Sequence, residues 1–159
     1  MGSEVITNIL RKCELFSELS DEEMGSIAEL GSIEEYEIGG LIYKRGALGT
    51  RLYVLSKGQV SLIRQIKLDD TRIANATVYV LRESPSLRIM GCWCTLVGEQ
   101  HIQMCSARCD KPSQVISIDC TRLRELFVKN PNMHLKILKK LVLIMRERLE
   151  SSYVAMETL

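Results

Sequence analysis

The first thirty residues show the periodicity of two short helices. The first helix is marked by a single apolar face made by Val5, Ile6, Ile9 and Leu10. Ser20 and Glu23 have the spacing of a capping box, which predicts the start of a second helix. That helix is expected to end at Gly31. The chain is therefore predicted to open as helix, turn, helix.

From Ser32 onward the apolar positions change to the short, alternating runs that are typical of β-strands. Glycines that suit tight turns separate these runs, namely Gly39, Gly40, Gly46, Gly49 and Gly58. The expected strands include Ile33, Tyr36, Ile38 and residues 41–43, 52–55, 60–62, 77–81, 104–109 and 114–118. Short strands at such close spacing predict an antiparallel barrel or sandwich.

The pattern returns to that of helices after residue 118. Asp119 is a suitable N-cap for a helix that buries Leu123, Leu126 and Phe127. Pro131 suits the first position of a final helix, which is expected to run to about Met156. The predicted order is helices, β-strands, then a long helix.

The turns and strands between Gly46 and Leu62 carry a resemblance to a known family. Two glycines in a turn precede the apolar residues 52–55, and Gly58 precedes an alternating strand. This spacing resembles the cyclic-nucleotide-binding domain, the regulatory β-roll of the catabolite activator and fumarate-nitrate regulator family, of cyclic-nucleotide-gated channels and of protein kinase regulatory subunits. Residues 15–23 resemble the entry helices of that family, and residues 115–127 resemble its last strand and first C-terminal helix.

The resemblance implies a mainly β fold with flanking helices. The expected architecture is an antiparallel, double-stranded β-roll of jelly-roll type, with N-terminal helices and a long C-terminal dimerisation helix. Residues 1–159 would form one cyclic-nucleotide-binding-like sensor domain, with helices and β-roll over about 10–130 and the dimerisation helix over about 131–156. No DNA-binding domain is expected within these residues.

The phosphate-binding cassette departs from the family pattern. Members that bind cyclic nucleotides carry a Phe-Gly-Glu-like segment followed by an arginine, which hold the ribose and the cyclic phosphate. Here Gly91 is kept, but Cys92 replaces the glutamate and Gln103 aligns with the arginine. Losing a bidentate charged pair costs on the order of 2–5 kcal/mol, so we expect no binding of cyclic AMP or cyclic GMP in the usual manner. The residues expected to line a ligand pocket closed by the last helix are Gly91, Cys92, Trp93, Cys94 and Gln103.

The cysteines leave alternatives open. Cys92, Cys94, Cys105 and Cys109 are interpreted as buried thiols, as a redox-active pair or as zinc or iron–sulfur ligands. No metal and no cofactor is assigned to the chain. A further alternative is a structural dimerisation or protein-interaction domain whose pocket is filled by side chains.

The last helix carries two apolar stripes. One has the three- and four-residue spacing of a coiled-coil seam and comprises Leu135, Leu138, Val142, Met145 and Leu149. The other, Ile137, Leu141 and Ile144, is expected to pack on the β-roll. Because regulators of the resembled family dimerise through this helix, we expect a homodimer through the first stripe.

Composition and charge exclude some classes of function. The chain of 159 residues is 46% hydrophobic and 26% charged with a net charge of +1, which excludes a disordered chain and gives no support for nucleic-acid binding. With no long apolar run and no signal peptide, we expect no membrane association and a cytoplasmic location. No nucleophile–base pattern is present, so no enzyme is expected. The predicted function is a ligand-sensing regulatory domain, either the effector module of a transcriptional regulator with a small-molecule effector or a stand-alone sensor.

Overall fold

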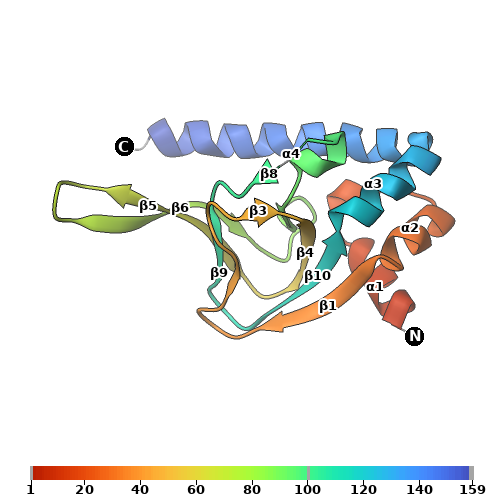
Figure 1. The fold of residues 1–159 in the computed structure, drawn as a ribbon, viewed down its shortest axis with the longest axis horizontal. Helices are drawn as coiled ribbons and strands as arrows, with labels where there is room; N and C mark the ends of the chain where they lie inside the picture. Colours follow the sequence, from red (N-terminus) through yellow and green to blue (C-terminus); the bar gives the residue numbers. More distant parts are fainter. Residues whose placement is uncertain (1, 100, 158–159) are drawn as a thin grey trace.

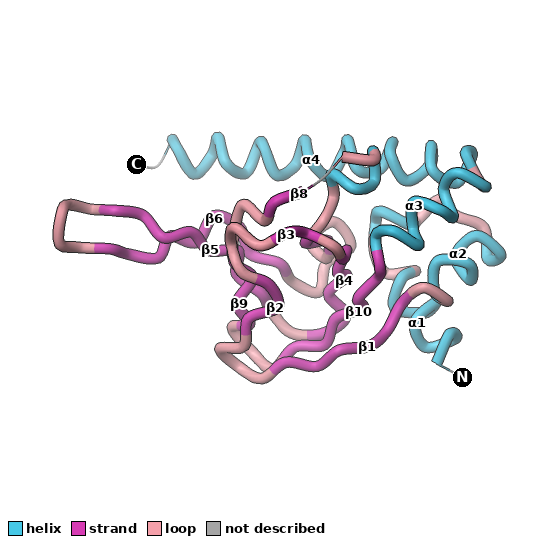
Figure 2. Tube along the Cα trace, viewed as in Figure 1, coloured by secondary structure: helices cyan, strands magenta, loops and turns pink. Residues whose placement is uncertain are grey.

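The computed structural model describes residues 2–99 and 101–157. Short helices gather at one end, strands form the body, and a long helix crosses the whole length on one side (Figure 1). Figure 2 shows the same arrangement by element type, with a two-stranded hairpin that projects from the body. None of the helices built from the described residues is long and apolar enough to span a membrane.

The N-terminal helices form as the sequence predicts. They are α1 (Gly2–Leu10), the 3-10 helix η1 (Glu14–Phe16) and α2 (Asp21–Ala28). The capping box is complete, because the Ser20 hydroxyl accepts from the backbone N–H of Glu23 at 3.2 Å while the Glu23 carboxylate accepts from that of Ser20 at 2.9 Å. Ile6, Ile9 and Leu10 of α1 are buried, which confirms its predicted apolar face.

The strands form two four-stranded sheets and a small pair, and every strand pairing is antiparallel. The first sheet has the order β1 (Gly31–Tyr36), β10 (Ser113–Asp119), β4 (Arg51–Lys57), β7 (Ile89–Gly91). The second has the order β2 (Leu41–Tyr43), β9 (Ser106–Cys109), β5 (Val60–Lys67), β6 (Ile73–Leu81). The pair is β3 (Leu48–Gly49) with β8 (His101–Ile102). The predicted antiparallel β-roll is confirmed.

Strand β4 lies between two hydrophobic cores, which explains its unbroken apolar run. Leu52 and Val54 belong to a core shared with the helices. Tyr53 and Leu55 point to the other face and belong to a core between the two sheets. Because side chains alternate along a strand, a strand with both faces buried is apolar at every position.

The chain ends in α3 (Cys120–Lys129) and α4 (Pro131–Glu157). Asp119 is the N-cap of α3, and its carboxylate accepts from the backbone N–H of Arg122 at 3.0 Å. In α4, Ile137 and Ile144 are buried and Leu141 is partly buried against the core that the helices share, as predicted for the second stripe. Helix α4 runs across the β-roll toward the side from which the β5–β6 hairpin projects (Figure 1).

The predicted seam of α4 needs a correction. Leu138 and Met145 pack against the core of their own chain instead of facing outward. Leu135, Val142 and Leu149 are each more than half exposed, at 51%, 67% and 53%. They lie seven residues apart and form a narrower apolar stripe than a seam at every third and fourth residue.

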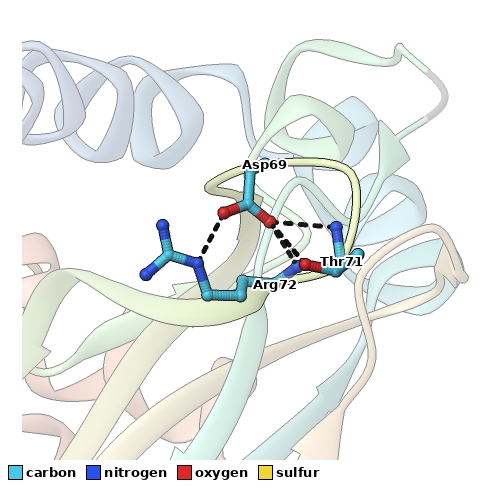
Figure 3. Close-up of polar contacts among 3 residues, drawn as sticks. All are labelled: Asp69, Thr71 and Arg72. Atoms are coloured by element: carbon cyan, nitrogen blue, oxygen red, sulfur yellow. Dashed lines mark hydrogen bonds and ion pairs between the residues drawn. The ribbon is translucent and has the colours of Figure 1, made fainter.

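The β5–β6 hairpin differs from the prediction in its length. Both strands continue beyond the apolar residues, and the turn between them is held by a single carboxylate (Figure 3). Asp69 accepts from the backbone N–H groups of Thr71 and Arg72, each at 2.9 Å, and from the Arg72 guanidinium at 2.6 Å. These bonds lower the pKa of Asp69, the Thr71 backbone bond most of all. Ile38, expected in a strand, lies in the turn between β1 and β2.

Candidate ligand-binding site

A cavity of about 480 Å³ lies between the β-roll and α4. Strands β2, β5 and β6 and the segment from β7 through β9 supply most of its walls. Helix α4 supplies Leu141, Met145, Arg148 and Ser152, whose spacings of four, three and four residues place them on one face. The remaining lining is largely apolar and includes Leu62, Val78, Val97 and Met104. A mostly apolar cavity of this size is typical of small-molecule sites.

Arg148 is the only arginine, lysine, aspartate or glutamate among the described residues that line this cavity. Its guanidinium carbon lies over two aromatic rings, 4.0 Å from the ring centroid of Trp93 and 4.4 Å from that of Tyr79. The negative faces of these rings attract the cation. The aromatic side chains of β6 and of the segment after β7 therefore hold the arginine of α4 in place.

The guanidinium of Arg148 is short of acceptors. Its Nη2 donates to the backbone carbonyl of Ile89 and the guanidinium also hydrogen-bonds the side chain of Tyr79, while its buried Nε has no hydrogen-bond partner among the described residues. None of the ion pairs found between described residues includes Arg148. Burial lowers the pKa of Arg148 to about 10, because the charged form loses solvation that no carboxylate replaces.

Four of the five residues predicted to line a pocket do line this cavity: Gly91, Trp93, Cys94 and Gln103. Their part in binding stays a prediction. Gly91 has a φ of 97°, and a Cβ at this position would lie 2.7 Å from the carbonyl oxygen of Arg51. Only glycine adopts this backbone conformation here without strain, so Gly91 determines the direction of the segment that follows.

Cys92 does not line the cavity, which corrects the prediction for this residue. Its side chain is fully buried in the core that the helices share, and its thiol donates to the carbonyl oxygen of Gly49 at 3.0 Å. After Cys92 the chain has left β7 and turns into the 3-10 helix η2 (Cys94–Val97). The side chains of Cys92 and Trp93 therefore have different surroundings. A glutamate side chain is longer and charged, and it would not fit this apolar place.

Several solved structures share this arrangement of β-roll and helices. A cyclic nucleotide-binding domain from Methylobacillus flagellatus has 20% identity and a TM-score of 0.75, covering 96% of this chain and 81% of that one. The N-terminal domain of a transcriptional regulator from Streptomyces coelicolor has 19% identity and a TM-score of 0.67, with 90% and 94% coverage. The chain has the cyclic-nucleotide-binding-domain fold.

The same fold occurs in a protein that is described as independent of cyclic AMP. The regulatory subunit of a cAMP-independent protein kinase A from Trypanosoma brucei has 17% identity and a TM-score of 0.66, covering 87% of this chain and 46% of that one. No protein-family model and no curated protein sequence matches the chain. The relationship is therefore visible in structure, where the cyclic-nucleotide-binding-domain fold is shared at low sequence identity.

Gln103 is the residue at which the sequence analysis expected the arginine of the resembled family. Its side chain is only 5% exposed, and its Oε1 lies 3.3 Å from Nε2 of His101, which is also buried. Its backbone N–H donates to the carbonyl oxygen of Ala47 at 2.9 Å. This pair occupies part of the cavity wall, and the Gln103 amide offers no charge for a phosphate.

The four cysteines of interest do not come together. Cys92 belongs to the core shared with the helices, Cys109 to the core between the sheets, and Cys94 and Cys105 line the cavity. Burial raises the pKa of Cys105 and of Cys109, so both favour the neutral thiol. Across residues 2–99 and 101–157, no three His, Cys, Asp or Glu side chains are grouped so that they could hold a metal ion.

Sequence reasoning missed the polar centre of the cavity. Arg148, Tyr79 and Tyr43 all line it, and none was singled out. One signal was present for Arg148, since it lies on the same helix face as Leu141 and Met145. A charged residue in the middle of an apolar stripe indicates either a buried charge or a functional group.

Proposed function

We propose that this chain is a ligand-sensing regulatory domain whose cavity binds a small molecule other than cyclic AMP or cyclic GMP. The observation that carries the proposal is the cavity of about 480 Å³ whose walls come from both the β-roll and α4. A ligand in this place contacts the sensor body and the long helix at once. Its binding energy can therefore depend on how α4 sits, which is the physical requirement for a regulatory switch.

Two positions support the exclusion of cyclic nucleotides. Cys92 is buried in a core and cannot replace a glutamate that holds a ribose hydroxyl, and Gln103 offers no charge to a cyclic phosphate. A solved neighbour with this fold is described as independent of cyclic AMP, so the fold alone does not require that ligand. The walls that remain are apolar and suit a different ligand chemistry.

The proposal includes a homodimer formed through the exposed stripe of α4. Leu135, Val142 and Leu149 form an apolar line on the side of the helix that its own chain leaves uncovered. A second copy that packs on this stripe would bury it by two-fold symmetry. Ligand contacts on one face of α4 and partner contacts on another would then be coupled through the same helix.

The cellular role belongs to the same proposal. The domain acts as a regulatory module, not as an enzyme, either as the effector part of a transcriptional regulator or as a stand-alone sensor. Cys13, Cys94, Cys105 and Cys109 are free thiols, which suits the reducing cytoplasm.

A thermal-shift experiment with cyclic AMP tests the first half of the proposal. A ligand at one hundred times its Kd stabilises the native state by about 2.7 kcal/mol, which raises the melting temperature of a chain of this size by about 5–10 °C. We expect cyclic AMP and cyclic GMP at about 50 μM to raise the melting temperature by less than about 1 °C. A rise of several degrees with either nucleotide would contradict the interpretation of Cys92 and Gln103.

A screen of small metabolites with the same readout tests the second half, using two tryptophan variants. Met145→Trp places a large side chain in the cavity, whereas Val128→Trp places one at an 83% exposed position of α3 that is not part of the cavity wall. Metabolites that raise the melting temperature of the wild type and of Val128→Trp, but not of Met145→Trp, would support the cavity as the site. No active metabolite, or equal shifts in all three proteins, would overturn it.

A further inference from the structure

The cavity holds a positive charge for which the described residues supply no counter-ion. Arg148 enters from α4, its guanidinium lies over the rings of Trp93 and Tyr79, and no described aspartate or glutamate pairs with it. Buried charges in proteins are usually paired, because removal from water is costly when nothing replaces the lost solvation. A methionine or leucine here would match the apolar neighbours Leu141 and Met145 without that cost.

The hydrogen bonds of the guanidinium are also incomplete. A guanidinium has five N–H groups that can donate hydrogen bonds. In Arg148, Nη2 donates to the carbonyl oxygen of Ile89, and the buried Nε has no acceptor among the described residues. The side chain of Tyr79 also hydrogen-bonds the guanidinium, and the aromatic faces attract the cation, but neither ring supplies a counter-ion. A carboxylate supplies two acceptor oxygens in the spacing that matches a guanidinium edge.

The rest of the cavity restricts what can be attached to that carboxylate. Its walls near Arg148 include hydrocarbon and aromatic groups such as Val78, Tyr79 and Met145, and no lysine and no second arginine lines the described part. A doubly charged phosphate would leave charge without a partner on these walls. A ligand with an apolar body and one negative charge leaves no charge without a partner.

We propose that the cavity binds an apolar organic carboxylate, with Arg148 of α4 as the residue that recognises its charge. This inference rests on the proposed function, because it names the chemical class of the ligand for the same cavity. Recognition then comes from the long helix instead of from the cassette. The ligand joins α4 to the rings of Trp93 and Tyr79 through one charged contact.

Isothermal titration calorimetry with matched pairs of probes tests this inference. The probes are 4-phenylbutyrate and indole-3-acetate, each compared with its primary amide, which has the same body without the charge. We expect each carboxylate to bind the wild type about 10-fold to 100-fold more tightly than its amide, the ratio typical of a hydrogen-bonded charge pair.

Two arginine variants on the same helix locate the effect. Arg148→Met keeps an apolar chain of similar length and should reduce carboxylate affinity to that of the amide while amide binding stays the same. Arg146→Met is the control, since Arg146 is 74% exposed and pairs with Glu150 at 3.4 Å outside the cavity. That variant should keep the full preference for the carboxylate.

The outcomes separate this inference from the proposed function. If amides bind the wild type as tightly as carboxylates, or if Arg148→Met keeps the preference, the inference is wrong although the cavity still binds small molecules. If no probe binds up to millimolar concentration, an apolar carboxylate is not the ligand class. Should the metabolite screen then also find no ligand that depends on position 145, the proposed function fails as well.

Discussion

At the scale of single residues, the site depends on one backbone conformation. Gly91 ends β7 with a φ of 97° and lies against the carbonyl of Arg51 and the ring of Tyr53. Of the residues that follow, Cys92 is buried in the core that the helices share, while Trp93 packs against that core and also lines the cavity. The position of the cavity wall therefore depends on a residue that has no side chain.

We expect Gly91→Ala to lower the free energy of unfolding by about 2–4 kcal/mol, because the added Cβ meets both a strained φ and two close neighbours. Urea denaturation followed by circular dichroism measures this. The control is Gly25→Ala in α2, where a Cβ meets nothing within 4 Å. That substitution should raise stability by about 0.5–1 kcal/mol, since alanine favours helix. Equal effects of the two substitutions would contradict the role of Gly91.

Residues of the site differ in how well the sequence predicts them. Gly91, Trp93, Cys94 and Gln103 are close in sequence, and the spacing of glycines and strands places them together at the cavity. Arg148 is contributed by a distant helix, and its position depends on how α4 packs on the β-roll. The local sequence pattern does not determine that packing, so the position of the Arg148 charge in the cavity was not predicted.

At the scale of elements, α4 has different neighbours on its different faces. Ile137 and Ile144 are buried in the core, Met145 and Arg148 face the cavity, and Val142 belongs to the exposed stripe. Exposed polar residues such as Lys139, Arg146 and Glu147 occupy another side of the helix. The exposed apolar stripe is the surface proposed for a second copy of the chain.

We expect Val142→Asp combined with Leu149→Asp to convert the proposed homodimer to a folded monomer near 18.0 kDa, because the substitutions place like charges opposite each other across a two-fold axis. Light scattering coupled to size exclusion measures the mass, and circular dichroism checks the fold. Val128→Asp, at an exposed position of α3, serves as the control and should stay dimeric. A double variant that remains dimeric would place the interface on another surface.

Elements were predictable where their own residues determine them. The capping box of α2, the N-cap Asp119 and Pro131 at the start of α4 are local signals, and the structure confirms all three. The short strands β3, β7 and β8 were missed, because two or three residues become a strand only through a partner that is distant in sequence. The long β5–β6 hairpin was underestimated for a related reason, since its polar half depends on cross-strand pairing and on the Asp69 turn.

At the scale of the whole molecule, burial of titratable groups links stability to alkaline pH. Burial raises the pKa of Cys13 from 9.0 to about 12, and it also raises the pKa of Tyr43 and of Tyr53. Below pH 9 these groups are neutral in both the folded and the unfolded chain, so they cause no pH dependence. Above pH 9 the unfolded chain loses protons that the folded chain keeps, and unfolding becomes more favourable.

The free energy of unfolding should therefore fall as the pH rises from about 9 to about 11, with Cys13 alone contributing up to about 1.4 kcal/mol per pH unit. Urea titrations at several pH values in reductant measure this slope. Cys13→Ala should reduce the slope relative to the wild type, because it removes the buried thiol. Parallel slopes in the wild type and the variant would show that the buried thiol is not responsible.

The stacking of Trp93 on Arg148 has an optical consequence. Trp93 is the only tryptophan in the chain, and its ring centroid lies 4.0 Å from the guanidinium carbon of a residue that lines the same cavity. The tryptophan fluorescence of the protein, excited selectively over that of its tyrosines, therefore originates from one indole at one wall of the cavity. Any molecule that enters changes the polarity around this ring, and any movement of α4 changes the distance from the ring to a cation. Emission wavelength and lifetime thus report occupancy and helix position without an added dye.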